Sequence, residues 1–306
     1  MKKKKNFCLH GEVYSPKDIT AVLDMAVDDS CLRGNNKKQK FFDIPVCFDI
    51  ETSSFYKNGD DYLSYEQYVK LGVKLEKCSC MYVWQFGING YCIVGRTWEE
   101  FTEMMETISD YLQLSEDRRL IVYVHNLAYE FQFIRNRFTW NKVFSIDLRK
   151  PIYAITESGI EFRCSYLLSG YSLAKLGGQL MKYKCEKMVG DLDYSLLRHS
   201  KTPLTEKEMG YCLNDVKVVM CYIQEMIERY KGITHLPITK TGFVRKYCRK
   251  HCLYCEDEFG KTVQNWTYIN TIHDLNISGA DEFNTLQRAF SGGFTHANAN
   301  HTDDVI

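Results

Sequence analysis

The chain has 306 residues, of which 45% are hydrophobic, and it carries 39 basic and 39 acidic side chains. This length favours one large domain plus an extension, and the zero net charge argues against coating of duplex nucleic acid by bulk charge. No stretch is apolar enough to span a bilayer, and the 13 scattered cysteines, an odd number, indicate reduced thiols. We therefore expect a cytoplasmic protein without membrane contacts.

The first predicted strand ends in two acidic residues. Residues 1–40 are polar and mixed, and we expect residues 1–42 to be an N-terminal extension. Residues 44–47 form an apolar run typical of a buried strand, which we predict over residues 44–50. Because alternate side chains of a strand share a face, Asp49 and Glu51 point the same way and their apolar neighbours point into a core. Two adjacent carboxylates repel each other unless a cation lies between them, which predicts a divalent-metal site. The alternative is an ordinary acidic strand end in solvent.

The next segments predict an antiparallel continuation of the sheet. Residues 53–70 are expected to form a loop that covers the acidic site. Residues 80–87 and 91–95 are predicted strands, because Asn89-Gly90 between them is a strong hairpin signal. A helix then begins after Thr97, which is spaced for a capping box with Glu100.

The second half of the chain alternates strands and helices. Residues 120–124 are fully apolar, as in the middle of a covered sheet, and a helix follows directly. Residues 152–155 and 160–164 predict another hairpin, and a capping box at Thr205 opens a long helix that ends near Tyr230. The order of elements is that of a ribonuclease-H-like α/β fold, with a mixed central sheet flanked by helices.

Two further acidic motifs follow in chain order. Asn126 and Glu130 come after the fourth strand, near the edge at which open α/β sheets bind ligands. Tyr211 and Asp215 lie at positions i and i+4 of the long helix and so share one face, and an Asp in an apolar helix needs a partner. Taken singly, each motif has an alternative, a surface Glu130 or a solvent-facing Asp215. In order, D-x-E, N-x-x-x-E and Y-x-x-x-D form the signature of DEDD-type 3′–5′ exonucleases, and the Tyr marks the DEDDy subclass.

The sequence resembles the amino-terminal exonuclease domain of protein-primed family B DNA polymerases of phages. The resemblance runs from Val46 to the chain end and rests on residues 48–53, 123–130, 190–194 and 211–215. Phe290-Ser-Gly-Gly-Phe294 resembles the Y-x-G-G linker before the polymerase domain, with Phe where Tyr is usual. No polymerase motif follows, so we expect an exonuclease domain over 43–235 and a connecting segment over 236–306, truncated before the palm.

The resemblance implies hydrolysis of the terminal phosphodiester at a single-stranded DNA 3′ end with two Mg²⁺ or Mn²⁺ ions. Asp49 would bridge the ions, Glu51 and Asp215 would complete their shells, and Tyr211 would orient the attacking water. Tyr211 is a poor general base because the unperturbed pKa of a phenol is about 10. Glu130 stands where the best-known members carry Asp, one methylene shorter.

The resemblance also implies a set of DNA-binding residues: Thr52, Asn126, Tyr129, Ser165, Lys187, Phe290, Gly292 and Gly293. Stacking of a base on Tyr129 would suit any sequence. Ser172 competes with Ser165 for the family's S-L-x-x motif. The family's catalytic Lys corresponds to Val189, and Lys187, two residues earlier on the same face of an extended segment, is the expected substitute.

The implied partners are a DNA 3′ end, a terminal protein and a separate polymerase portion. One rival hypothesis is a non-catalytic module of a split polymerase that binds DNA or the terminal protein, which the departures at Glu130 and Val189 favour. The other is a DEDDy ribonuclease, against which the linker-like stretch at 290–294 argues.

Overall fold

The structure, a computed structural model, describes residues 7–35, 37–188, 196–274 and 279–289. The chain divides into two compact units, Met1–Gly242 and Phe243–Ile306, called unit 1 and unit 2 below. Phe290, Gly292 and Gly293 of the linker-like stretch, and Val189 with residues 190–194, lie outside the described residues.

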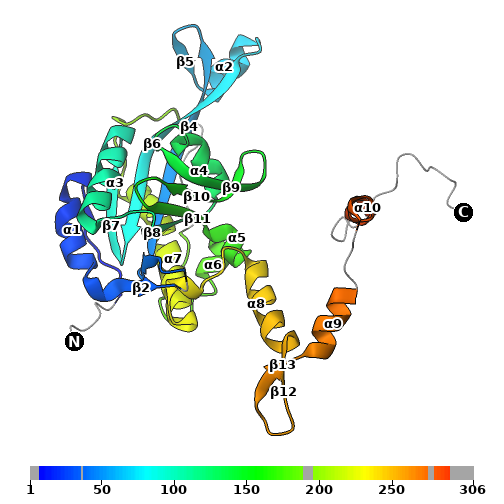
Figure 1. The fold of residues 1–306 in the computed structure, drawn as a ribbon. Helices are drawn as coiled ribbons and strands as arrows, with labels where there is room; N and C mark the ends of the chain where they lie inside the picture. The colour runs from blue at the N-terminus through cyan, green and yellow to red at the C-terminus, as the bar shows by residue number, and fades with distance from the viewer. Residues whose placement is uncertain (1–6, 36, 189–195, 275–278, 290–306) are drawn as a thin grey trace, which may run out of the picture. The chain divides into compact units, whose positions relative to one another are not determined.

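Unit 1 is built around one mixed sheet (Figure 1). Its strands are β1 (Val13–Tyr14), β2 (Leu32–Gly34), β3 (Lys40–Phe42), β4 (Val46–Asn58), β5 (Asp61–Leu63), β6 (Glu76–Ile88), β7 (Tyr91–Gly95), β8 (Arg118–Val124), β9 (Trp140–Asp147), β10 (Lys150–Thr156) and β11 (Ile160–Cys164). Its helices are α1 (Ile19–Ala26), α2 (Tyr65–Leu71), α3 (Trp98–Leu112), α4 (Leu127–Ile134), α5 (Ser165–Ser169), α6 (Leu173–Gly177) and α7 (Glu206–Tyr230), and α8 (Lys240–Cys252) begins in this unit.

The strand order confirms the ribonuclease-H-like fold. Neighbouring strands follow the path β1-β7-β6-β4-β8-β11-β10-β9. β6 is antiparallel to both β4 and β7, whereas β4, β8 and β11 run parallel. The meander predicted from Asn89-Gly90 is therefore correct, and the parallel strand β8 lies in the middle of the sheet, where its apolar residues are buried.

The two faces of β4 have different partners. Phe48 and Ile50 are buried in the main core beside α1 and α3, and the Phe48 ring stacks on Phe101 with centroids 4.4 Å apart. The other face carries Asp49 and Glu51 and is covered by α7. Both predicted capping boxes, at Thr97 for α3 and at Thr205 for α7, are present, so the helices begin where the sequence indicated.

The segment after the acidic motif corrects one prediction. Residues 53–70, expected as a covering loop, instead extend β4 to Asn58 and form β5 and the helix α2. β4 stays paired with β6 as far as Lys57, and the Tyr56 and Tyr68 rings stack at 3.8 Å. Figure 1 shows this hairpin projecting from the top of the sheet. The prediction failed because the first part of this segment pairs through its backbone with β6, and local composition does not reveal such pairing.

Residues within the first 42, expected as an extension, pack into unit 1. β1 pairs with β7 and β3 pairs with β8, so both strands belong to the sheet. The amide of buried Asn89 donates to the carbonyl of Ala26 at 2.7 Å, which ties the β6–β7 turn to α1.

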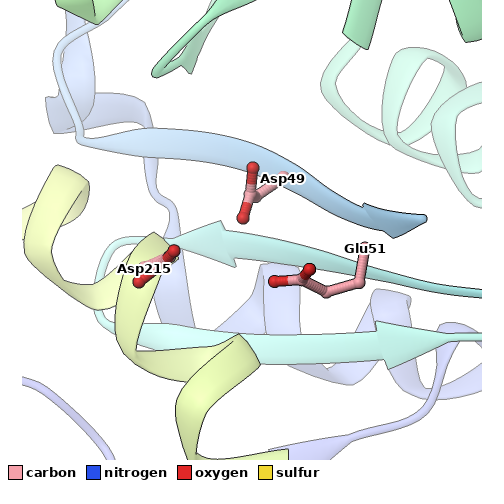
Figure 2. Close-up of side chains that lie close together, drawn as sticks. All are labelled: Asp49, Glu51 and Asp215. Carbon is pink, nitrogen blue, oxygen red and sulfur yellow. The ribbon is translucent and has the colours of Figure 1, made fainter. Parts of the chain in front are cut away.

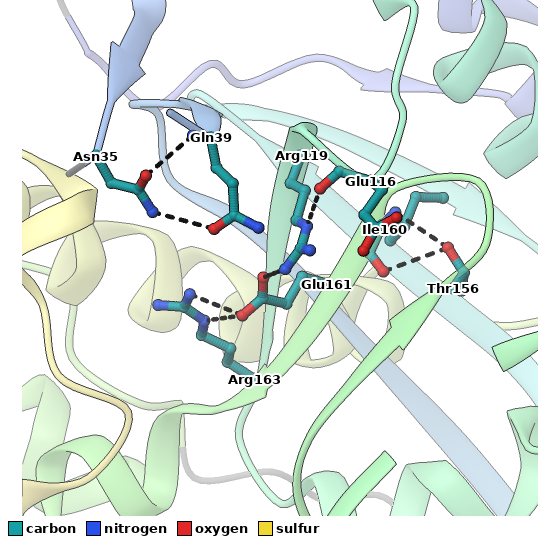
Figure 3. Close-up of polar contacts among 8 residues, drawn as sticks. All are labelled: Asn35, Gln39, Glu116, Arg119, Thr156, Ile160, Glu161 and Arg163. Carbon is teal, nitrogen blue, oxygen red and sulfur yellow. Dashed lines mark hydrogen bonds and ion pairs between the residues drawn. The ribbon is translucent and has the colours of Figure 1, made fainter. Parts of the chain in front are cut away.

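The neighbouring strands β8 and β11 carry a buried ion-pair network (Figure 3). Glu161 on β11 is 3% exposed and accepts from Arg119 on β8 at 3.2 Å and from Arg163 at 2.7 Å. Burial lowers the pKa of Arg163, but the Glu161 carboxylate and other partners outweigh it, so the pKa is raised and the guanidinium stays charged. A buried charge left without its partner is costly, so this trio fixes the pairing of β8 with β11.

Unit 2 has little core of its own among its described residues. It contains most of α8, the hairpin β12 (Tyr254–Glu256) and β13 (Thr262–Gln264), and the helices α9 (Trp266–Asp274) and α10 (Ala280–Ala289). Neither α8 nor α9 has a buried residue. Within the described part of the chain, every helix is too short or too polar to cross a membrane.

Candidate metal and nuclease site

Three carboxylates from distant parts of the sequence converge on one point (Figure 2). Asp49 and Glu51 extend from β4 and Asp215 from the middle of α7, and each contributes one carboxylate oxygen to a group within 4.8 Å. Strand alternation puts the first two on the α7 face, and the packing of α7 on β4 brings the third to them.

Burial makes this site unfavourable for negative charge. Glu51 and Asp215 are each 8% exposed. Loss of solvent raises the pKa of Glu51 to about 7, with a further contribution from Asp215. Burial and then the charges of Glu130, Glu51 and Asp215 raise the pKa of Asp49 well above its ordinary value. These carboxylates need positive charge to ionise together.

Glu130 lies beside this group without joining the three. It is 5% exposed on α4, and its Oε2 is buried with no hydrogen-bond partner in the described structure. Burial, and secondarily the charge of Glu51, raises the pKa of Glu130 to about 8. Its charge in turn acts on Asp49, so the structure excludes the surface alternative for Glu130 and puts it next to the site.

A lysine enters the site from the segment before α7. Lys187 Nζ lies 2.9 Å from Asp215 Oδ2 and 5.3 Å from the centre of the Tyr211 ring. Tyr211 is one turn before Asp215 and is partly exposed. This cation lowers the pKa of Asp215, whereas burial, the larger effect, raises it. Asp215 Oδ1 has no hydrogen-bond partner in the described residues and remains available to a ligand.

Two of the expected DNA-binding residues form a pair at the edge of the site. Thr52 Oγ1 and the Tyr129 hydroxyl are 2.5 Å apart, which joins β4 to α4. Tyr129 is 41% exposed, so part of this aromatic residue is accessible to solvent. Asn126 is exposed at the N-cap position of α4, but its side chain makes no capping bond.

Ser165 is arranged differently from a surface contact residue. It is 0% exposed, and its hydroxyl lies 3.1 Å from His125 Nδ1. Ser172, the competing residue, caps α6 through the amide of Lys175. In the structure Ser165 is therefore a buried partner of His125 and not an exposed contact for a strand.

Sequence reasoning missed two basic side chains that couple to the site, His125 through Lys187 and Arg198 through Glu51. His125 directly precedes Asn126, its Nε2 is buried without a partner among the described residues, and burial followed by the charge of Lys187 lowers its pKa to about 4. Arg198 pairs with Glu208 at 2.7 Å and lowers the pKa of Glu51. The position of His125 directly before the second motif was a usable signal, whereas no pattern in the sequence pointed to Arg198.

The donor set fits a divalent cation. All the converging atoms are carboxylate oxygens, which hard cations such as Mg²⁺ and Mn²⁺ prefer. Asp215 and Glu130 each have a carboxylate oxygen without a hydrogen-bond partner in the described residues, and these oxygens are free to bind an ion or its water. In the described residues, this is the one group of three or more potential metal-ligating residues.

Comparison with known proteins finds similarity at the level of solved structures. No protein-family model and no curated protein sequence matches the chain. A phi29 DNA polymerase ternary complex aligns with 14% identity and a TM-score of 0.49 over 83% of this chain and 40% of that one. The catalytic core of RRP6 from Trypanosoma brucei aligns with 11% identity and a TM-score of 0.37, over 84% and 63% of the two chains. The Aedes aegypti Nibbler EXO domain aligns with 11% identity and a TM-score of 0.40, over 79% and 99%. This chain spans less than half of the phi29 enzyme, and similarity at this level assigns no activity to it.

Proposed function

We propose that this chain is a metal-dependent 3′–5′ exonuclease that shortens single-stranded DNA ends, as the amino-terminal portion of a protein-primed DNA polymerase. The observation that carries the proposal is the convergence on one point of three carboxylates from two separate motifs, the half-buried Asp49 and the buried Glu51 and Asp215. Because these carboxylates repel each other and Lys187 supplies one positive charge for the three of them, the arrangement is unfavourable unless the site also holds a metal cation.

Each side chain has a role that its position supports. Asp49, Glu51 and Asp215 would hold two Mg²⁺ or Mn²⁺ ions, which when bound stabilise the attacking and leaving oxygens of an in-line displacement. Tyr211 would hydrogen-bond the attacking water and orient it, and Lys187 beside it would offset negative charge on the scissile phosphate. Glu130 would hold a proton or, when ionised, a metal-bound water.

The strand would be held at the edge formed by Thr52 and Tyr129. Stacking on an exposed aromatic ring contributes about 1–3 kcal/mol per base and does not depend on base identity. The hydroxyl pair between the two residues fixes the ring relative to the end of the acidic motif on β4. Such an arrangement serves removal of any terminal nucleotide, which proofreading requires.

The test is a time course with a 5′-labelled single-stranded DNA oligomer in Mg²⁺ or Mn²⁺. Stepwise shortening that Asp49→Asn and Asp215→Asn each abolish is the expected result. Asp110→Asn, an exposed residue on α3, is the matched control and should leave the rate unchanged.

The same assay separates the rival functions. Equal or faster shortening of an RNA oligomer would support a ribonuclease instead. A folded protein that binds the DNA oligomer without shortening it would support the non-catalytic module of a split polymerase.

A further inference from the structure

One residue of β6 lies directly across from the first metal-site carboxylate. Gln85 pairs in register with Asp49 on β4 and with Val94 on β7. Residues opposite each other on antiparallel strands put their side chains on the same face, about 5 Å apart at Cβ. Gln85 therefore lies on the face covered by α7, where its strand neighbour Val83 packs against Cys212.

The side-chain amide of Gln85 is buried without a partner. Gln85 is 0% exposed, and neither its Nε2 nor its Oε1 has a hydrogen-bond partner among the described residues. Its neighbours in β6 from Met81 to Ile88 are buried and otherwise apolar or glycine. An apolar side chain would fill this position without the desolvation cost of an unpaired amide. A buried polar group without a partner therefore needs an explanation such as a bound ion or water.

Other buried polar atoms without hydrogen-bond partners belong to residues around Asp49. Asp215 Oδ1 and Glu130 Oε2 are also buried without partners, and both residues act electrostatically on Asp49. An amide is neutral, so Gln85 adds no repulsion to the carboxylates, and unlike a lysine it does not compete with a cation for them. It offers N–H donors for a carboxylate and a carbonyl oxygen for water.

We propose that Gln85 is a positioning residue of the divalent-metal site: its side-chain N–H, unpaired in this structure, would donate to the Asp49 carboxylate when the site holds an ion. The inference rests on the metal site of the proposed function. Groups that hydrogen-bond metal ligands orient them, and their loss costs about 10–100-fold in metal affinity.

The experiment measures Mn²⁺ binding to the full chain by calorimetry, with thermal unfolding of the metal-free protein alongside. Gln85→Leu removes both polar atoms at similar volume, and Gln85→Met does so with an unbranched side chain. Both should bind Mn²⁺ about tenfold more weakly. In EDTA both should unfold about 2–4 °C above the wild type, because an unpaired buried amide is gone.

Gln224→Leu is the matched control. Gln224 is also buried, at 8% exposure, but its Nε2 donates to Glu228 at 2.9 Å on α7. This variant should unfold at a lower temperature than the wild type and keep its Mn²⁺ affinity. The unfolding temperature should thus rise in the Gln85 variants and fall in Gln224→Leu. This contrast separates a positioning role of Gln85 from a general loss of packing.

The outcomes also separate this inference from the proposed function. Mn²⁺ affinity within twofold of the wild type in both Gln85 variants, with binding lost in Asp49→Asn, would overturn the role of Gln85 alone. Absence of Mn²⁺ binding by the wild type would overturn both. In the exonuclease assay, a tenfold higher Mn²⁺ requirement with the full rate at saturation would support the inference, because a misfolded site would lose the rate itself.

Discussion

Replacing Glu130 with Gln is expected to make the metal-free protein more stable at neutral pH. The side chain is 5% exposed, and its pKa rises from 4.5 to about 8 in the folded chain. Between these two values the folded state keeps a proton that the unfolded state releases. The protonated Glu130 therefore contributes fully to the free energy of unfolding below pH 4.5, and this contribution is lost as the pH rises to about 8.

The magnitude follows from the width of this window. Each pH unit within it costs about 1.4 kcal/mol, so that by pH 7 the wild type has lost about 3 kcal/mol that Glu130→Gln retains. The variant has nearly the same shape and no proton to release. At roughly 2–4 °C per kcal/mol, its melting temperature should exceed that of the wild type by about 6–12 °C at pH 7 and match it near pH 4.5.

The assay is thermal unfolding followed by circular dichroism from pH 4.5 to 8 in EDTA. Glu106→Gln, an exposed glutamate on α3, is the control and should follow the wild type at every pH. Parallel curves for wild type and Glu130→Gln would refute the reasoning, since they would mean that Glu130 ionises as readily in the folded as in the unfolded chain.

Three further predictions concern the reaction. Lys187→Met removes the cation 2.9 Å from Asp215 and should slow shortening of a labelled oligomer by about 10²-fold; an unchanged rate would exclude Lys187 from the site. Tyr129→Ala should weaken binding of a single-stranded oligomer by about 1–3 kcal/mol in fluorescence anisotropy, whereas Tyr129→Phe keeps the stacking surface, and equal losses in both would argue against stacking. EDTA should abolish shortening and excess Mg²⁺ or Mn²⁺ should restore it, and activity that survives chelation would rule out the metal mechanism.

The local rules of strand and helix predicted much of the fold. The alternation of Asp49 and Glu51 with Phe48 and Ile50 assigned both faces of β4 correctly, because strand geometry fixes it. The capping signals at Thr97 and Thr205 worked for the same reason, since a cap satisfies backbone groups within four residues. Each of these features depends on residues close together in the chain.

Features that depend on distant contacts were missed. The prediction of a loop over 53–70 was wrong because β4 is extended by its pairing with β6. The paired residues are far apart in the sequence, as Ser54 and Ser79 show. The strands β1 and β3 owe their existence to pairing with β7 and β8, and their own residues gave no signal. Strand pairing at such separations is a tertiary property.

The sequence by itself determined which acidic residues are candidates and which way the strand carboxylates point. Only the tertiary structure decided that Asp215 meets them, that Glu130 is buried beside them, and that Lys187 pairs with Asp215. It also revealed that Gln85 is buried without a partner directly across the sheet from Asp49, the observation on which its proposed role rests. The physical reason is that periodicity fixes the direction of a side chain within its own element, whereas burial, charge coupling and the pairing of polar atoms depend on which elements pack together.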